Sequence, residues 1–252
     1  MTLTPVSFLI VCPMLFLAGF VDAIGGGGGL ISLPAYLFAG LPVHQAIATN
    51  KLSSSCGTTL ATVRFLKNGL INLRLAAPAV AAAFAGSSLG ARLSLTVSED
   101  VMKYILFIVL PAAAFAVLNR HLFGEGGSEA KADRRTVTIC MLSALVIGLY
   151  DGFYGPGTGT FLIIAFTVLA KMSVSAANAQ AKVINLTSNI TSLAVFLLNG
   201  QVVVLLGLAG AVCNMAGNWL GSGLAITKGA KIVRPVILAV LALLLIKILT
   251  GF

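Results

Sequence analysis

The chain has 252 residues, of which 58% are hydrophobic and only 9% are charged, and its mean hydropathy is +1.04. This composition excludes an ordinary soluble domain, whose surface needs far more charge at this size. The formal net charge of +9 does not indicate a nucleic-acid partner, because the basic residues lie mostly between apolar runs, as cytoplasmic loop anchors do.

Apolar runs recur along the whole length, so we predict an all-α polytopic membrane protein. The first 24 residues contain no Lys or Arg, which favours a retained span over a cleaved signal peptide. In the first half, glycine, proline or polar turns separate helices predicted near residues 7–24, 30–39, 46–66, 73–93 and 101–118. The second of these segments rises only about 15 Å, about half of a hydrocarbon core. We therefore expect a glycine-broken half-span there, and whether it re-enters stays open.

The second half shows the same series, with helices predicted near residues 136–153, 160–170, 176–198, 202–226 and 232–250. Its stretch "GLYDGFYGPGTG" from Gly148 resembles "GFVDAIGGGGG" from Gly19. Further features match in the same order: Asp22 with Asp151, Lys51 with Lys182, Asn68 with Asn199, and "GSSLG" from Gly86 with "GNWLG" from Gly217. We therefore predict an internal duplication, with a first transmembrane repeat at 1–118, a cytoplasmic linker at 119–135 and a second repeat at 136–252.

Loop charge indicates how the two halves are oriented. The turn around Asn68 is strongly basic, whereas the matching turn around Asn199 carries no charge. The bias reverses at the next turn, which is basic in the second half, around Lys228 and Lys231. Under the positive-inside rule, matching loops then lie on opposite sides of the membrane, which predicts inverted repeats with both termini facing outward. A parallel four-plus-four arrangement is the alternative.

Two of the seven acids in the chain, Asp22 and Asp151, lie in apolar context, and they are repeat partners. A carboxylate at membrane depth costs at least about 2.5 kcal/mol on insertion scales, so it is rare without a partner or a function. One interpretation is structural, with each carboxylate capping the glycine-rich turn that follows it by accepting backbone N–H bonds. The other is a proton acceptor suited to proton-coupled transport.

The glycine-rich breaks release backbone from helical hydrogen bonding just before the two short helices. Unpaired N–H groups at a helix N-terminus carry partial positive charge, so two such N-termini brought together would form an oxyanion cradle near the midplane. The residues expected to supply this cradle are Gly26, Gly27, Gly28, Gly29, Gly155, Gly157, Thr158 and Gly159. The alternative is close helix packing, which we favour, because of their small-xxx-small spacing, for Gly86, Gly90, Gly217 and Gly221.

Two lysines, Lys51 and Lys182, strengthen the anion interpretation, since they occupy matching positions near the start of the third segment of each half. Polar neighbours suited to binding oxygen atoms are Thr49, Asn50, Gln180, Asn185 and Asn189. The alternative is that each lysine snorkels to the interface or pairs with the aspartate of its own half. No metal site is expected, because the two histidines have no companion ligands and the four cysteines form no CxxC pair.

The paired stretches "GFVDAIGGGGGLISLP" and "GLYDGFYGPGTGTF", followed by "AIATNK" and "NAQAKVIN", resemble the sulfite exporter TauE/SafE family, also called the toluene-sulfonate uptake permeases. The resemblance covers nearly the whole chain. It implies a secondary carrier of sulfur-containing anions, such as sulfite, sulfoacetate or other organosulfonates, coupled to protons in the plasma membrane (the bacterial inner membrane). At the motif positions of the family stand Asp22, the glycines at 25–29, Thr49, Asp151, Gly155, Pro156, Gly157, Gly159, Gln180 and Lys182. The unbroken glycine string at 25–29 is a departure, because many members carry a bulkier residue there.

We therefore expect a transporter rather than an enzyme, with a small anionic substrate held at paired helix N-termini, no cofactor, and the lipid bilayer as its surroundings. The alternatives are a passive anion channel and a carrier for a different small anion. A membrane enzyme is not indicated, since no nucleophile lies beside a base and no metal spacing occurs. Whether the protein works as a monomer or a homodimer stays open.

Overall fold

The computed structural model describes residues 4–98, 100–102, 104, 132–229, 231–232 and 235. Within these residues the chain is all-helical, which confirms the predicted fold class. The helices are α1 (Pro5–Gly25), α2 (Gly29–Phe38), α3 (Val43–Lys67), α4 (Leu73–Thr96), α6 (Arg134–Phe153), α7 (Thr158–Val168), α8 (Val174–Leu198) and α9 (Val204–Lys228). They match the predicted segments to within a few residues. Most of 101–118, 119–135 and 232–250 lies outside the described residues, and the three-part division of the chain stays a prediction.

Five of the described helices, α1, α4, α6, α8 and α9, are long and apolar enough to cross a membrane. The helix α3 is as long as α8, at 25 residues, but is more polar because it carries Lys51 and a run of serines and threonines. With 10 and 11 residues, α2 and α7 are too short to cross, as the sequence predicted.

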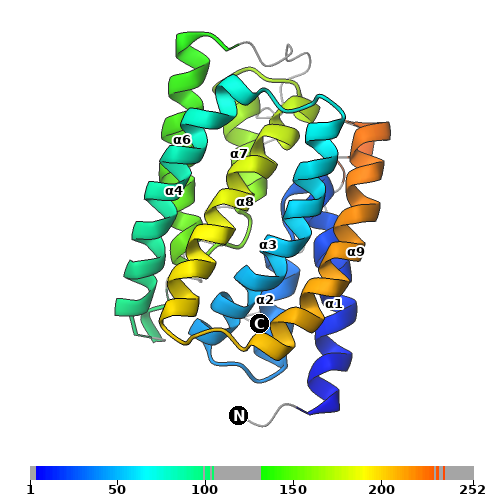
Figure 1. Ribbon diagram of the computed structural model, residues 1–252, viewed down its shortest axis with the longest axis vertical. Helices are drawn as coiled ribbons and strands as arrows, with labels where there is room; N and C mark the ends of the chain where they lie inside the picture. Colours follow the sequence, from blue (N-terminus) through cyan, green and yellow to red (C-terminus); the bar gives the residue numbers. More distant parts are fainter. Residues whose placement is uncertain are drawn as a thin grey trace.

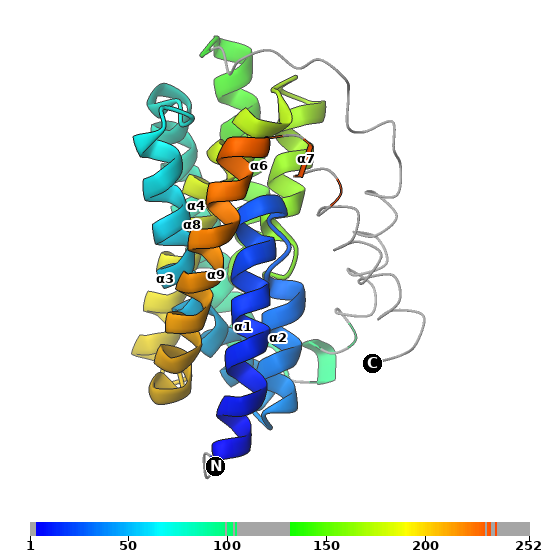
Figure 2. The same ribbon diagram turned by 90° about the vertical axis from the view of Figure 1, so that its right-hand side faces the viewer.

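Each short helix turns back along the long helix before it. The helix α1 runs away from the N-terminal end, the chain breaks at the glycine run, and α2 returns toward the end where α1 began (Figure 1, Figure 2). The helices α6 and α7 repeat this hairpin from the opposite end of the molecule (Figure 1). As a result, the two breaks lie inside the bundle rather than at its ends.

Helices of one half pack mainly against helices of the other half. The helix α1 packs against α9, α4 packs against α6, and α3 contacts α8. An added Cβ at Gly86 or Gly90 would overlap the backbone of α6, and one at Gly217 or Gly221 would overlap the backbone of α1. The packing role predicted for these four glycines is therefore confirmed: they let two helix backbones approach closely.

Basic residues gather at one end of the molecule. The α3–α4 turn, the start of α6 and the end of α9 share that end, whereas the N-terminus lies at the other (Figure 1). These places carry Arg64 and Lys67, Arg134 and Arg135, and Lys228. The positive-inside rule predicts that this basic end faces the cytoplasm. Matching helices such as α1 and α6 run in opposite directions in Figure 1, which favours inverted repeats; that arrangement stays a prediction.

Candidate functional site

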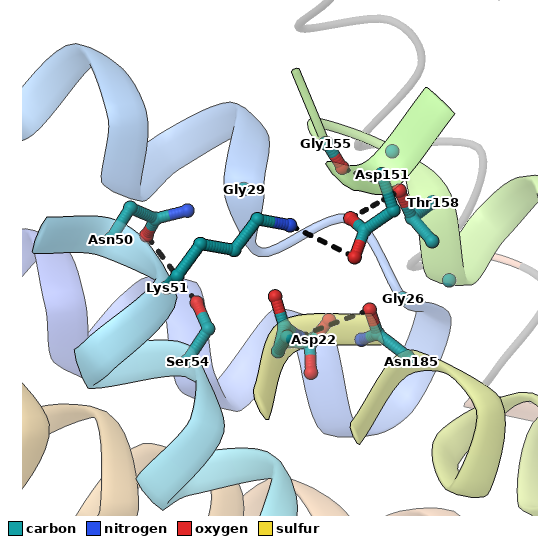
Figure 3. Close-up of a pocket in the computed structure, with 13 residues that line it drawn as sticks. Asp22, Gly26, Gly29, Asn50, Lys51, Ser54, Asp151, Gly155, Thr158 and Asn185 are labelled. Atoms are coloured by element: carbon teal, nitrogen blue, oxygen red, sulfur yellow. Dashed lines mark hydrogen bonds and ion pairs between the residues drawn. The ribbon is translucent and has the colours of Figure 1, made fainter. Parts of the chain in front are cut away.

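A small polar cavity lies where the two glycine-rich breaks meet (Figure 3). Its volume is about 20 Å³, where a single water molecule needs about 10–15 Å³. Both halves line it, with Asp22, Gly26, Gly29, Asn50, Lys51, Ser54, Asp151, Gly155, Gly157, Thr158, Gly159, Asn185 and Asn189. The space admits a water molecule and leaves no room for a larger anion in this conformation.

Glycine explains why the chain can break here. The helix α1 ends where Gly26 takes a left-handed conformation with φ 78°, and the Gly26 N–H donates to the Asp22 carbonyl at 2.8 Å. Gly155 holds the matching place in the second half, with φ 102°. Where the breaks meet, backbone contacts backbone, because an added Cβ at Gly26 or Gly159 would lie too close to the other residue. The site therefore needs glycine both for the turn and for the close approach.

Side chains of the second half satisfy the carbonyl groups that α1 leaves free at its end. The Thr160 hydroxyl donates to the Gly25 carbonyl at 2.8 Å. The Asn178 amide donates to the carbonyls of Ala23 and Ile24 at 3.3 and 3.1 Å. The break is thus stabilised without water or lipid supplying hydrogen bonds, as a non-helical backbone at membrane depth requires.

The N-terminal ends of both short helices border the cavity. Gly29 begins α2, and Thr158 and Gly159 are the first two residues of α7. Such ends carry partial positive charge, although the Leu30 and Thr158 N–H groups already donate to the Gly27 and Gly155 carbonyls at 3.1 and 3.2 Å. The structure therefore brings together the two N-termini that the sequence predicted would meet, and the binding of an anion between them stays a prediction.

Lys51 reaches across the cavity from α3 to Asp151 on α6 (Figure 3). The Lys51 Nζ lies 2.8 Å from the Asp151 Oδ2, and both side chains are only 2% exposed. Two hydroxyls also donate to this carboxylate, Thr158 to Oδ1 at 2.7 Å and Ser188 to Oδ2 at 2.5 Å. Hydrogen bonds to an ionised group are roughly twice as strong as neutral ones, so donors from three helices hold Asp151 in place.

Lys182 on α8 makes the matching pair with Asp22 on α1. The Lys182 Nζ lies 3.0 Å from the Asp22 Oδ2 and also donates to the main-chain carbonyl of Asp22. Lys182 is fully buried, whereas the Asp22 side chain is 12% exposed. One hydroxyl, that of Thr58, approaches the Asp22 Oδ2, at 3.5 Å. Asp22 therefore has fewer and longer hydrogen bonds than Asp151.

The ion pairs cross between the halves, which the sequence interpretation did not foresee. It offered pairing within each half or snorkelling to the interface, and both are wrong, because each buried lysine contacts the aspartate of the other half. The capping interpretation gains no support either. Within the described part of the chain, the donors to the two carboxylates are lysines and hydroxyls rather than backbone N–H groups.

Two predicted binding residues lie away from the cavity. The Thr49 hydroxyl accepts a hydrogen bond from the Val203 N–H at 3.0 Å. Gln180, in the matching position, accepts from the Asn72 N–H and donates to the Asn72 carbonyl, both at 3.2 Å. Asn72 directly precedes α4, and Val203 directly precedes α9; each is the fourth helix of its half. Thr49 of the first half therefore holds the start of α9, and Gln180 of the second half holds the start of α4.

Three further predicted residues flank the cavity without lining it. Lys182 pairs with Asp22, which does line the cavity. Gly28 faces the backbone of α1, because an added Cβ would lie 2.5 Å from the Ala18 carbonyl oxygen. The Gly27 carbonyl accepts the Leu30 N–H at 3.1 Å in the first turn of α2.

One lining residue, Ser54, was missed by the sequence analysis. Its hydroxyl donates to the Asn50 Oδ1 at 3.3 Å, and Asn189 makes a similar bond to the Asn185 Oδ1 at 3.2 Å. Helical spacing could have identified it, since Ser54 follows Lys51 by three residues, as Asn185 follows Lys182. No group of three or more metal-ligating side chains occurs among the described residues.

Comparisons with known proteins identify relatives that are all described as exporters or membrane transporters. The family model described as sulfite exporter TauE/SafE matches residues 11–248. The probable membrane transporter protein ORF9 of Sinorhizobium sp. is 37% identical over 243 residues, which cover 96% of this chain and 92% of the relative. The probable membrane transporter protein YfcA of Escherichia coli K12 is 35% identical over 251 residues, 96% and 93% of the two chains. A probable membrane transporter protein of Haemophilus influenzae is 36% identical over 223 residues, 88% and 86%. No solved structure matches.

Proposed function

Because the chain belongs to the sulfite exporter TauE/SafE family, we propose that it carries a small sulfur-containing oxyanion, such as sulfite, sulfoacetate or another organosulfonate, by a proton-coupled mechanism. The protein is a multi-pass membrane transporter of the plasma membrane, with at least five helices able to cross it. The name of the family supports a sulfur oxyanion, and the chemistry of the cavity supports an anion in general.

The observation that carries the proposal is the pair of buried lysines beside two helix N-termini. Each lysine is neutralised by one carboxylate, so one fixed positive group lines the cavity and another flanks it, and their present counter-ions are side chains. An oxyanion is negatively charged and presents oxygen acceptor atoms, as a carboxylate does. It can therefore replace a carboxylate as the partner of a lysine, while the N-termini of α2 and α7 stabilise its remaining oxygen atoms.

The small cavity volume is part of the mechanism we propose. About 20 Å³ corresponds to a closed form in which the carboxylates occupy the place of the substrate. Substrate enters when one hairpin, α1–α2 or α6–α7, moves relative to the other about the glycine contact between them. Alternating exposure of one central site by two repeats is the common pattern of secondary transporters with broken helices.

Transport by the purified protein in proteoliposomes tests the proposal. We expect uptake of labelled sulfite or isethionate that unlabelled sulfonate inside the vesicles stimulates, because a carrier returns faster when loaded. High flux without this trans-stimulation would support the passive channel instead. Uptake of phosphate or chloride in preference to sulfur oxyanions would identify a carrier for a different anion. Recovery of the substrate chemically unchanged supports a transporter rather than an enzyme.

Alanine in place of Lys51 or Lys182 should abolish this uptake, because each change removes a cation from the site. The matched control is Lys67→Ala, which removes an exposed lysine at the end of α3 and should leave uptake unchanged. Full uptake by both Lys51→Ala and Lys182→Ala would reject the role of the lysines.

A further inference from the structure

The two ion pairs differ, and we infer from the difference that Asp22 is the carboxylate that exchanges a proton with each anion, while Asp151 stays ionised and fixes Lys51. This assignment rests on the proposed anion transport. It deepens the proposal by giving the two aspartates different roles, although they are repeat partners.

Asp151 is built to remain charged. Its two oxygen atoms receive hydrogen bonds from Lys51, Thr158 and Ser188 at 2.8, 2.7 and 2.5 Å. A proton on this carboxyl group would convert an acceptor into a donor, so the Thr158 or Ser188 hydroxyl would have to turn to its other acceptor, the Gly155 carbonyl at 2.7 Å or the Asn185 carbonyl at 3.1 Å. Protonation of either aspartate would leave its lysine without a charged partner, so what distinguishes Asp151 is its two close hydroxyl donors.

Asp22 lacks those hydroxyls because glycine stands in their places. In the repeat register, Thr158 corresponds to Gly29, and Ser188 corresponds to Gly57. An added Cβ at Gly57 would overlap the side chains of Asn214 and Asn218, so a serine there would require both to move. The one hydroxyl that approaches Asp22 comes from Thr58, at 3.5 Å. The first half therefore lacks the two hydroxyls that, in the second half, hold Asp151.

Both aspartates border the cavity, and Asp22 is the more exposed of the two. Its side chain is 12% exposed against 2% for Asp151, and it borders the cavity with Asn185 (Figure 3). The ionisable groups around it are Lys182 from α8, Lys51 from α3 and Asp151 from α6. Among the described residues, α2, α7 and α9 add no charged side chain to the cavity.

Lys182 stays in place when the Asp22 carboxylate is neutralised, because it also donates to the main-chain carbonyl of Asp22. A proton on Asp22 therefore leaves a fixed, buried cation with no anionic partner and raises the charge of the site by one. A bound monoanion restores neutrality. The proton and the anion are thus linked, with one proton taken up for each monoanion bound.

Binding of methanesulfonate to the purified protein between pH 5.5 and 8 tests this linkage, because the charge of a sulfonate does not change over that range. We expect the dissociation constant of the wild type to rise with pH, by up to tenfold per unit where Asp22 is ionised. In Asp22→Asn, which mimics the protonated form, we expect tight binding independent of pH. In Asp151→Asn we expect the pH dependence to persist.

If the dissociation constant of Asp22→Asn rises with pH as in the wild type, or if that of Asp151→Asn no longer rises, the assignment of the exchanged proton to Asp22 is wrong. An infrared difference spectrum between pH 8 and pH 5.5 gives a readout that needs no substrate. The band of a protonated carboxyl group should appear in the wild type and in Thr158→Ala, and should be absent from Asp22→Asn. If no sulfur oxyanion binds but this band depends on Asp22, the proposed function fails and the proton site stands. If a sulfur oxyanion binds and the band persists in Asp22→Asn, the proposed function stands and the assignment of the proton to Asp22 fails.

Discussion

Replacing Lys182 by methionine removes one charge of a buried ion pair while keeping an unbranched apolar stem of similar length. The Asp22 carboxylate then loses a donor at 3.0 Å and keeps a single hydroxyl at 3.5 Å. Its side chain is only 12% exposed, so water replaces the lost partner poorly. Removing one member of a buried pair costs about 3–5 kcal/mol, whereas removing both members is often neutral. We expect Lys182→Met to be destabilised by that amount.

Thermal unfolding in detergent, with and without a second change, measures this effect. For chains of 150–250 residues each kcal/mol corresponds to about 2–4 °C, so Lys182→Met should melt about 6–20 °C below the wild type. Adding Asp22→Asn should restore most of the loss, because no unpaired charge remains. The matched control adds Asp151→Asn instead. It should lower the melting temperature further, since Lys51 then also loses its carboxylate.

The double variants decide which aspartate is the partner of Lys182. Rescue by Asp151→Asn and not by Asp22→Asn would refute the crosswise pairing and return the lysine to its own half. Equal melting of Lys182→Met and the wild type would refute the buried pair altogether. If Lys182→Met yields no folded protein, recovery of folded protein in the Lys182→Met/Asp22→Asn variant is itself the predicted rescue.

Three further predictions follow from other parts of the structure. Gly217→Val should separate α1 from α9, because an added Cβ overlaps the Phe16 carbonyl; size-exclusion chromatography should show aggregated protein, unlike Leu220→Ala on the half-exposed face of α9. Gln180→Ala should lower the melting temperature through the loss of two hydrogen bonds, about 1–3 kcal/mol in total, yet leave the dissociation constant for methanesulfonate unchanged. Asp133 caps α6, and hydrogen bonds from the Thr136 side chain and then its N–H hold the pKa of Asp133 below the ordinary value. A lowered pKa stabilises the fold above the unfolded value of about 4. The melting temperatures of the wild type and Asp133→Ala should therefore differ at pH 7 and converge as the pH falls below about 4.

The helices could be predicted from the sequence because each apolar run ends at a strong local signal. The half-spans α2 and α7 followed from their length, and their N-terminal breaks followed from glycine, which the left-handed Gly26 and Gly155 require. These features depend on residues close together in the chain. One sequence therefore suffices to find them.

The pairing of the charges could not be predicted, because it depends on which helices meet. Lys51 and Asp151 are a hundred positions apart, and only the packing of α3 beside the α6–α7 break brings them together. Thr49 was assigned to the site because it precedes Lys51 by two residues, yet that spacing turns it about 200° around the helix, toward α9. Ser54, three residues after Lys51, lies on the same face and was overlooked. The angular position of each polar residue around α3, relative to Lys51, would have excluded Thr49 and included Ser54.

The exchange of charges between halves has a consequence for how this sequence can change over time. An aspartate at position 22 is tolerable only beside a lysine at position 182, and the same dependence links 151 to 51. A substitution in one half therefore needs a compensating substitution in the other half. Neither copy of the duplicated segment is free to diverge alone, and the four positions should be inherited as two linked pairs.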